Sequence, residues 1–251
     1  MKWPFGSRRD SEDSALGANE LVVLVDGSLS SRLVVYHDPH CYQAEQYRVF
    51  RTNLRAMNPT NDPRTLMFTS SSPDEGKSTT VANVALSLAE AEELKVCLVD
   101  MDLRGPRIHE LFDLPRGPGL SDILLDRIDP RRALQQGGVP NLSILTAGRH
   151  TDKPNDVLGS EYLQDLLAFL KRDYHYIIVD SPPCAVFSDA THMSTLMDGV
   201  ILVVALRDTM RHQAGEALAA LGAVGANLVG TFVTGAETAA AHDSVDTYHE
   251  A

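Results

Sequence analysis

Two kinds of segment alternate along most of this chain, and this alternation constrains the fold more than any other feature. Short runs rich in Val, Ile and Leu are followed by stretches whose apolar residues recur at helical spacing. The expected strands are residues 65–70, 95–100, 142–147, 174–180, 199–206 and 227–233, and the expected helices are residues 77–92, 162–172 and 211–221. Strands separated by helices pair in parallel, so we predict an α/β fold: a doubly wound, mostly parallel sheet with helices on both faces.

The segments outside this alternation divide the chain into three parts. Residues 1–20 are polar and charged and are predicted to be a flexible arm, and residues 236–251 carry four acids and no Lys or Arg, which predicts a mobile acidic tail. Residues 21–235 form the predicted folded domain. Its first part, residues 21–38, contains two short apolar runs around a Gly/Ser turn, and these runs are expected to be strands.

A further helix is expected over residues 44–57, before the first strand of the alternating region. One face of this helix is apolar, and the polar residues Glu45, Arg48 and Arg51 lie about one turn apart on another side. From spacing alone these three form an ion-paired surface worth only tenths of a kcal/mol. The apolar stripe consists of Tyr47, Phe50, Leu54 and Met57.

Composition excludes several classes of protein. The formal net charge of the 251-residue chain is −12, which argues against a nucleic-acid partner because such binding needs a basic face. The three cysteines, Cys41, Cys97 and Cys184, are far apart, so neither a disulfide framework nor a zinc cluster is indicated. No apolar run approaches the roughly 18–20 residues of a membrane span, and the start of the chain lacks the apolar part of a signal peptide. We expect a cytoplasmic protein.

Residues 69–80, TSSSPDEGKSTT, resemble a phosphate-binding (Walker A) loop. Gly76, Lys77 and Ser78 match the end of the pattern G-x-x-x-x-G-K-[ST], but Ser71 stands at its first glycine. A strand precedes the segment and an amphipathic helix follows it, so backbone N–H groups are expected to converge on one point. Lys77 would reach the terminal phosphates and Ser78 would bind Mg²⁺. The alternative is a capped helix start after a serine-rich turn.

Three aspartates follow two other predicted strands. Asp100 and Asp102 come at the end of KVCLVD, and Asp180 ends YHYIIVD. The carboxyl ends of parallel strands meet at one edge of the sheet, so these carboxylates and the loop are expected to lie together. Each aspartate alone could equally cap the next helix. In this order and together with the loop, they favour a nucleotide site that holds ATP and Mg²⁺.

These motifs resemble the bacterial tyrosine kinases of capsule and exopolysaccharide synthesis, the P-loop autokinases of the CpsD/CapB type, from about Leu33 to Val233. The loop is similar to that family's S-x-x-P-G-E-G-K-S, and LVDMDLRGP and IIVDSPP are similar to its two aspartate motifs. EQYRVFRTNL matches the Glu-x-x-Arg-x-x-Arg segment with which the family assembles rings. The resemblance therefore assigns assembly to Glu45, Arg48 and Arg51. It places the nucleotide at Ser72, Pro73, Asp74, Glu75, Gly76, Lys77, Ser78 and Thr79.

The resemblance implies transfer of the γ-phosphoryl group of ATP to a tyrosine on a neighbouring copy. In the catalytic roles, Lys77 would neutralise charge, Asp100 would accept the tyrosine proton, and Asp102 and Asp180 would bind Mg²⁺ with Ser78. Arg104 is open to two roles, a contact with phosphate or a neighbour and a surface ion pair. Tyr248, in the acidic tail, is the expected phosphoacceptor.

Three departures from the family pattern leave a second class of function open. Asp74 stands where the family has glycine, Thr234 ends a strand where relatives have asparagine near the base, and the tail offers only Tyr248 in place of a tyrosine cluster. These favour a nucleotide-dependent scaffold of the polysaccharide machinery with little kinase activity. A positioning ATPase of the MinD or ParA type is the other alternative, but its extra lysine is replaced here by Ser72.

The partners are also implied by the resemblance. It predicts a homo-oligomeric ring and a separate membrane protein, a polysaccharide co-polymerase whose cytoplasmic end activates the kinase. That partner would recruit the chain to the inner face of the plasma membrane.

Overall fold

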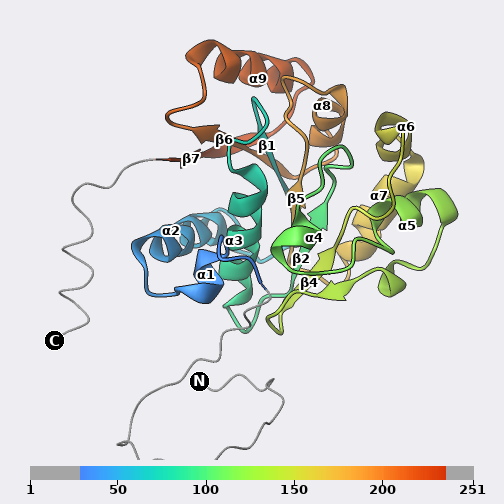
Figure 1. The fold of residues 1–251 in the computed structure, drawn as a ribbon, viewed down its shortest axis with the longest axis horizontal. Helices are drawn as coiled ribbons and strands as arrows, with labels where there is room; N and C mark the ends of the chain where they lie inside the picture. Colours follow the sequence, from blue (N-terminus) through green and yellow to red (C-terminus); the bar gives the residue numbers. More distant parts are fainter. Residues whose placement is uncertain (1–28, 236–251) are drawn as a thin grey trace, which may run out of the picture.

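The computed structural model of the protein describes residues 29–235, and within this range it contains a seven-stranded sheet (Figure 1). The order of the strands is β3-β4-β2-β5-β1-β6-β7, and every pairing is parallel except that of β3 with β4. This confirms the predicted α/β fold. The strands are β1 (Arg64–Ser70), β2 (Val96–Asp100), β3 (Gln135–Gln136), β4 (Leu142–Leu145), β5 (Tyr176–Asp180), β6 (Gly199–Ala205) and β7 (Leu228–Thr234).

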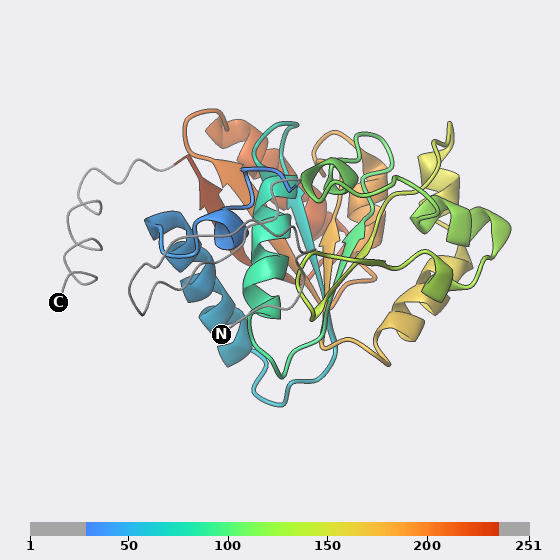
Figure 2. The ribbon, with the colours of Figure 1, turned by 60° about the horizontal axis from the view of Figure 1, so that its bottom comes forward.

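Helices cover both faces of the sheet (Figure 2). The helices α1 to α4 pack on one face, and α5 to α9 lie on the other side of the sheet or near its β4 end. The helices are α1 (Val34–His37), α2 (Tyr42–Ala56), α3 (Lys77–Ala89), α4 (Ile108–Leu111), α5 (Leu120–Asp126), α6 (Pro154–Leu158), α7 (Glu161–Leu170), α8 (Ser188–Ser194) and α9 (Arg211–Ala223), and a 3₁₀ turn spans Pro130–Arg132.

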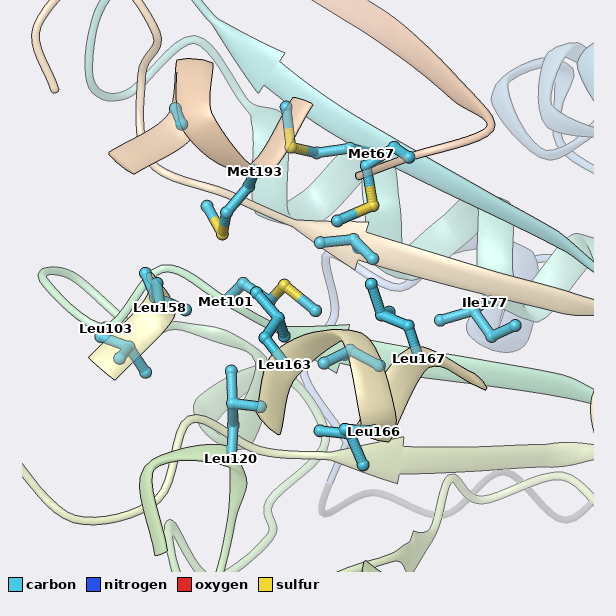
Figure 3. Packing of buried hydrophobic residues seen from close by; sticks show 14 of the residues in the cluster. Met67, Met101, Leu103, Leu120, Leu158, Leu163, Leu166, Leu167, Ile177 and Met193 are labelled. Carbon is cyan, nitrogen blue, oxygen red and sulfur yellow. The ribbon is translucent and has the colours of Figure 1, made fainter. Parts of the chain in front are cut away.

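Side chains that alternate along the strands build two separate hydrophobic cores. Met67 and Val99 belong to the core under α5, α7 and α8, whereas Leu66 and Phe68 belong to the core under α2 and α3. Figure 3 shows the first of these cores, which contains Met67, Met101 and Met193 together with leucines of α7; Met101 lies beside Leu163. Every residue of the central strands β2 and β5 is buried on one face or the other, which is why these strands read as nearly continuous apolar runs.

The segment before α2 corrects one prediction. The second apolar run, expected to be a strand, forms the short helix α1, while the first run lies outside the described residues. Asn83 of α3 explains the change. Its Oδ1 accepts a hydrogen bond from the Val35 backbone N–H (3.1 Å) and its Nδ2 donates to the Arg32 carbonyl (2.9 Å), so this backbone pairs with a side chain and not with a strand.

The other predicted elements form close to their expected bounds. The helix expected over residues 44–57 spans Tyr42–Ala56, and the helix expected to reach residue 92 ends at Ala89. The sequence did not predict β3, α4, α5, α6 or α8, which contain two to seven residues each. The arm of residues 1–20 and the tail of residues 236–251 lie outside the described residues.

Candidate nucleotide site

The candidate site lies at the carboxyl edge of the sheet, where β1 ends and α3 begins. Gly76 is the N-cap of α3 and has a left-handed backbone with φ of 81°, a conformation that glycine adopts without strain. Lys77 is the first residue of the helix, so its side chain and the free N–H groups of the first turn both lie at the N-terminus of α3. This is the strand, loop and helix arrangement that the motif predicts.

Lys77 joins two of the three predicted aspartates. Its Nζ lies 2.9 Å from Asp180 Oδ1 and 3.6 Å from Asp102 Oδ2, and its side chain is only 8% exposed. Burial alone lowers the pKa of Lys77, but the charges of Asp180 and Asp102 outweigh it and leave the pKa raised. Lys77 is therefore held at the base of the loop by ion pairs with two carboxylates.

Asp100 and Asp180 face each other across the paired strands β2 and β5, and both are fully buried. Burial raises the pKa of Asp100 well above its usual range, and the charge of Asp180 adds to this. Both oxygens of Asp100 accept backbone hydrogen bonds, Oδ1 from Asp102 N (3.2 Å) and Oδ2 from Ile108 N (3.1 Å). Burial also raises the pKa of Asp180, although Lys77 opposes the shift.

Asp102 is the predicted carboxylate nearest to solvent. It is 8% exposed, whereas Asp100 and Asp180 have no exposed surface. Its Oδ1 accepts a hydrogen bond from the Gly105 backbone N–H (2.9 Å), which closes a tight turn directly after β2. The structure thus brings Lys77, Asp100, Asp102 and Asp180 together, in the grouping that the motifs predicted.

The donor set is compatible with Mg²⁺ shared with a nucleotide. Within residues 29–235 no three His, Cys, Asp or Glu side chains are close enough to hold a metal ion by themselves. Mg²⁺ typically binds one or two carboxylates and completes its shell with phosphate oxygens and water. Asp180 Oδ2 is buried without a hydrogen-bond partner among the described residues. The Ser78 side chain lies close enough to the Asp180 carboxylate to lower its pKa. The residues present therefore fit that ion.

The two acids of the loop occupy different environments. Asp74 has φ of 61° and is exposed, so its charge lies in solvent, at a position where the similar kinases have glycine. Glu75 is only 3% exposed. Its Oε2 accepts hydrogen bonds from the backbone N–H groups of Ser71 (2.8 Å) and Ser72 (3.1 Å), and its Oε1 accepts from the Ser71 hydroxyl (2.7 Å).

Two threonines that the motifs did not identify as supports also contact this loop. Thr209, in the turn after β6, donates its hydroxyl to Glu75 Oε1. Thr234, at the end of β7, donates its hydroxyl to the Glu75 carbonyl (3.0 Å), and its side chain lies against Gly76. Sequence reasoning considered Thr234 only for base recognition. No spacing pattern reveals these contacts, because Glu75, Thr209 and Thr234 come from segments that are far apart in the sequence.

Arg104 forms an ion pair with a buried partner. Its Nε lies 2.9 Å from Asp189 Oδ2 of α8, and its Nη2 donates to Asn155 Oδ1 of α6 (2.9 Å). The guanidinium carbon also lies 4.4 Å from the centre of the Phe187 ring. Of the two predicted roles, the structure shows an ion pair, and it ties the loop after β2 to α6 and α8.

The predicted assembly residues lie on the side of α2 that faces the end of α3. Arg48 Nη2 is 2.7 Å from Glu90 Oε1, and Arg51 Nη1 is 2.6 Å from Glu90 Oε2. Arg48 also pairs with Glu45 at 3.4 Å, but the Glu45 side chain remains 56% exposed. Both arginines thus have partners within the chain, and Glu45 keeps a free surface.

Comparison with known proteins places the chain in a family. The sequence profile of the ParA family, described as NUBPL iron-transfer P-loop NTPases, matches residues 64–235. Tyrosine-protein kinase YwqD of Bacillus subtilis is 32% identical over 207 residues, which are 82% of this chain and 87% of YwqD. The chain is a bacterial tyrosine kinase of the P-loop class. Its family is the one predicted from the motifs, the autokinases of capsule and exopolysaccharide synthesis.

Solved structures of bacterial tyrosine kinases share the fold of this one. The chimerical protein CapA2B2 has a TM-score of 0.76 and 29% identity, over 81% of this kinase and 89% of that chain. The kinase domain of the Escherichia coli tyrosine kinase ETK has a TM-score of 0.78 and 25% identity, over 83% and 82% of the two chains. No helix within residues 29–235 of this kinase is long and apolar enough to cross a membrane.

Proposed function

We propose that this kinase transfers the γ-phosphoryl group of ATP to a tyrosine of a neighbouring copy, and that Tyr248 is the acceptor. The arrangement of Lys77 carries the proposal, since its ammonium group is buried beneath the loop between Asp180 and Asp102. Phosphoryl transfer requires mainly in-line positioning and neutralised charge, and a fixed cation beside a helix N-terminus supplies both. Tyr248 itself lies outside the described residues.

The proposed roles of the site residues differ with the exposure of their side chains. Lys77 and the first-turn N–H groups of α3 would bind the terminal phosphates, and Ser78, Asp102 and Asp180 would hold Mg²⁺ directly or through water. Bound Mg²⁺ supplies further neutralisation of the phosphate charge. Asp102 has the exposed edge that a ligand requires, whereas Asp180 contributes mainly by fixing the Lys77 ammonium group.

Asp100 is the proposed acceptor of the tyrosine proton. Its raised pKa, caused first by burial, makes it a stronger base than an exposed carboxylate. Because both of its oxygens accept backbone hydrogen bonds and neither is exposed, the turn formed by residues 101–107 has to move before a tyrosine hydroxyl reaches it. This requirement fits a kinase that becomes active only when a neighbour or an activator repositions the turn.

The partners belong to the same proposal. Neighbouring copies would assemble through Glu45, whose side chain is exposed, with Arg48 and Arg51 held in place by Glu90. A membrane co-polymerase on a separate chain would recruit the kinase to the inner face of the membrane. The structural neighbour CapA2B2 is a chimerical protein, which is consistent with a kinase that works with a second polypeptide.

The test is incubation of the purified full chain with ATP and Mg²⁺, with and without an activator's cytoplasmic segment, followed by phosphosite mapping. We expect phosphate on Tyr248 and none in the Lys77→Met variant. Phosphate found only on other tyrosines would overturn the tail as acceptor. Nucleotide binding without any phosphotyrosine would favour the alternative, a nucleotide-dependent scaffold of the polysaccharide machinery.

A further inference from the structure

The Glu75 carboxylate lies inside the phosphate loop and is fully engaged there. Four hydrogen bonds converge on its two oxygens, from Ser71 N, Ser72 N, the Ser71 hydroxyl and the Thr209 hydroxyl. At 3% exposure it has little contact with water, so these donors must stabilise its charge. Four donors fix the orientation of this carboxylate, and the carboxylate likewise fixes the positions of Ser71, Ser72 and Thr209.

We propose that Glu75 is a positioning residue that keeps the phosphate loop in its binding conformation and joins it to the turn after β6. The inference rests on the proposed nucleotide binding. Glu75 occupies the N–H groups of Ser71 and Ser72 at the start of the loop. The N–H groups at the start of α3 have no partner inside the helix and stay available for phosphate.

Ser71 supports this assignment because it replaces the first glycine of the motif. Its hydroxyl donates to Glu75 Oε1 at 2.7 Å and its backbone N–H donates to Oε2 at 2.8 Å. A serine here therefore has a defined use that glycine could not serve, since glycine has no hydroxyl. Ser71, which replaces the first glycine of the motif, and the buried Glu75 are thus partners in the same hydrogen bonds.

Thr209 extends the contact to a second strand. Its hydroxyl accepts a hydrogen bond from the Ala205 backbone N–H (2.9 Å) at the end of β6 while it donates to Glu75. The neighbouring residues Leu206 and Met210 are each 61% exposed. Through Thr209, the conformation of the loop thus depends on an exposed turn on an adjacent strand.

This role predicts the sign of a substitution. If the Glu75 charge acted mainly by repelling the nucleotide, Glu75→Gln would bind more tightly. If Glu75 positions the loop, the glutamine amide replaces an acceptor with a donor that faces other donors, and affinity falls. We expect Glu75→Gln to weaken MgADP binding about tenfold, because two or more charge-assisted hydrogen bonds are lost.

The experiment is isothermal titration of the full chain with MgADP, combined with steady-state kinetics in ATP. We expect a raised KM for ATP with little change in kcat for Glu75→Gln, about threefold weaker binding for Thr209→Val, and affinity near the parent for Thr209→Ser, which restores the hydroxyl. Asp198→Asn is the matched control. The Asp198 carboxylate also accepts hydrogen bonds from a backbone N–H and a hydroxyl, those of Thr65. The Asp198→Asn variant should therefore lose stability, as Glu75→Gln does, while its MgADP affinity should not change.

The outcomes separate the two proposals. MgADP affinity in Glu75→Gln that equals or exceeds that of the parent would overturn the positioning role while leaving the kinase proposal intact. Absence of binding heat in the parent would overturn nucleotide binding, and this inference with it. If Glu75→Gln does not fold, the Thr209 pair decides, and equal affinity of Thr209→Val and Thr209→Ser would overturn the inference.

Discussion

Replacing Arg104 with methionine should destabilise the fold by an amount that the structure allows us to estimate. The change keeps most of the aliphatic stem but removes the hydrogen-bonded ion pair with Asp189, the hydrogen bond to Asn155 and the contact with Phe187. The Asp189 side chain is 1% exposed, and its Oδ1 has no partner among the described residues, so the variant leaves a buried carboxylate without a cation.

Removing one partner of a buried ion pair costs about 3–5 kcal/mol. Arg104 is 31% exposed, so water would reach part of the vacated space and reduce the penalty. We therefore expect Arg104→Met to lower the free energy of unfolding by about 2–3 kcal/mol. Asp189→Asn should remove part of the penalty of the unpaired carboxylate. The double variant should therefore lose about 1–2 kcal/mol less free energy of unfolding than the two single variants lose in sum.

The assay is urea unfolding of the nucleotide-free protein, followed by circular dichroism. Arg107→Met is the control, because Arg107 pairs with Glu110 at 3.1 Å on a surface where both side chains are more than half exposed. It should change the free energy of unfolding by less than about 0.5 kcal/mol. Equal effects of the Arg104 and Arg107 substitutions, or strict additivity with Asp189→Asn, would refute the argument from a buried unpaired charge.

Three further substitutions test the site and the sheet. Lys77→Met should abolish phosphotyrosine on the purified protein, and undiminished labelling on immunoblots would contradict its role. Asp74→Gly should raise MgADP affinity about two- to fivefold at low ionic strength, with a smaller gain at 0.5 M salt, because it removes an exposed like charge near the phosphates. Calorimetry at both salt concentrations measures the two affinities. A gain that does not depend on salt would contradict the argument. Burial raises the pKa of Asp198, but hydrogen bonds from Lys171 and Thr65 outweigh burial and leave the pKa below its usual 3.8. Its stabilising contribution is thus present above that pH and lost as the pH falls. Asp198→Asn should therefore cost about 1 kcal/mol at pH 7, and the difference between parent and variant in the free energy of urea unfolding should narrow as the pH falls below 3.8.

The sheet and the four charged residues of the site were predictable because each depends on local sequence. Runs of β-branched residues mark buried parallel strands, and an acid directly after such a run lies at the carboxyl edge of the sheet. Asp100, Asp102 and Asp180 follow from these two facts, whereas Lys77 follows from the end of the phosphate-loop motif, Gly76-Lys77-Ser78. The same reasoning failed for residues 34–37, where an apolar run forms a helix because Asn83, 48 residues further along the chain than Val35, binds its backbone.

The supports of the site could not be predicted, because they depend on contacts between distant segments. Glu75 and Thr209 are 134 residues apart, and Arg104 and Asp189 are 85 residues apart. A threonine or an aspartate in a loop has no periodicity, so only the packed structure shows its partner. The sequence therefore reveals the proposed phosphate- and metal-binding residues better than the residues that hold them in place.

The aromatic contacts of α2 have a consequence for how the domain can be shortened. The Tyr47 ring stacks on Phe232 of β7 with a centre-to-centre distance of 5.5 Å, and the Phe50 ring meets Phe232 edge-on at 5.1 Å. Two residues further along, Thr234 supports the phosphate loop. A deletion through α2 would therefore remove the aromatic cover of β7, the strand that carries Thr234, and it would also remove the residues through which we propose that copies assemble. If such a deletion lost both phosphorylation and self-association, the loss could not be assigned to one of these two changes, whereas a point substitution at solvent-facing Glu45 would separate them.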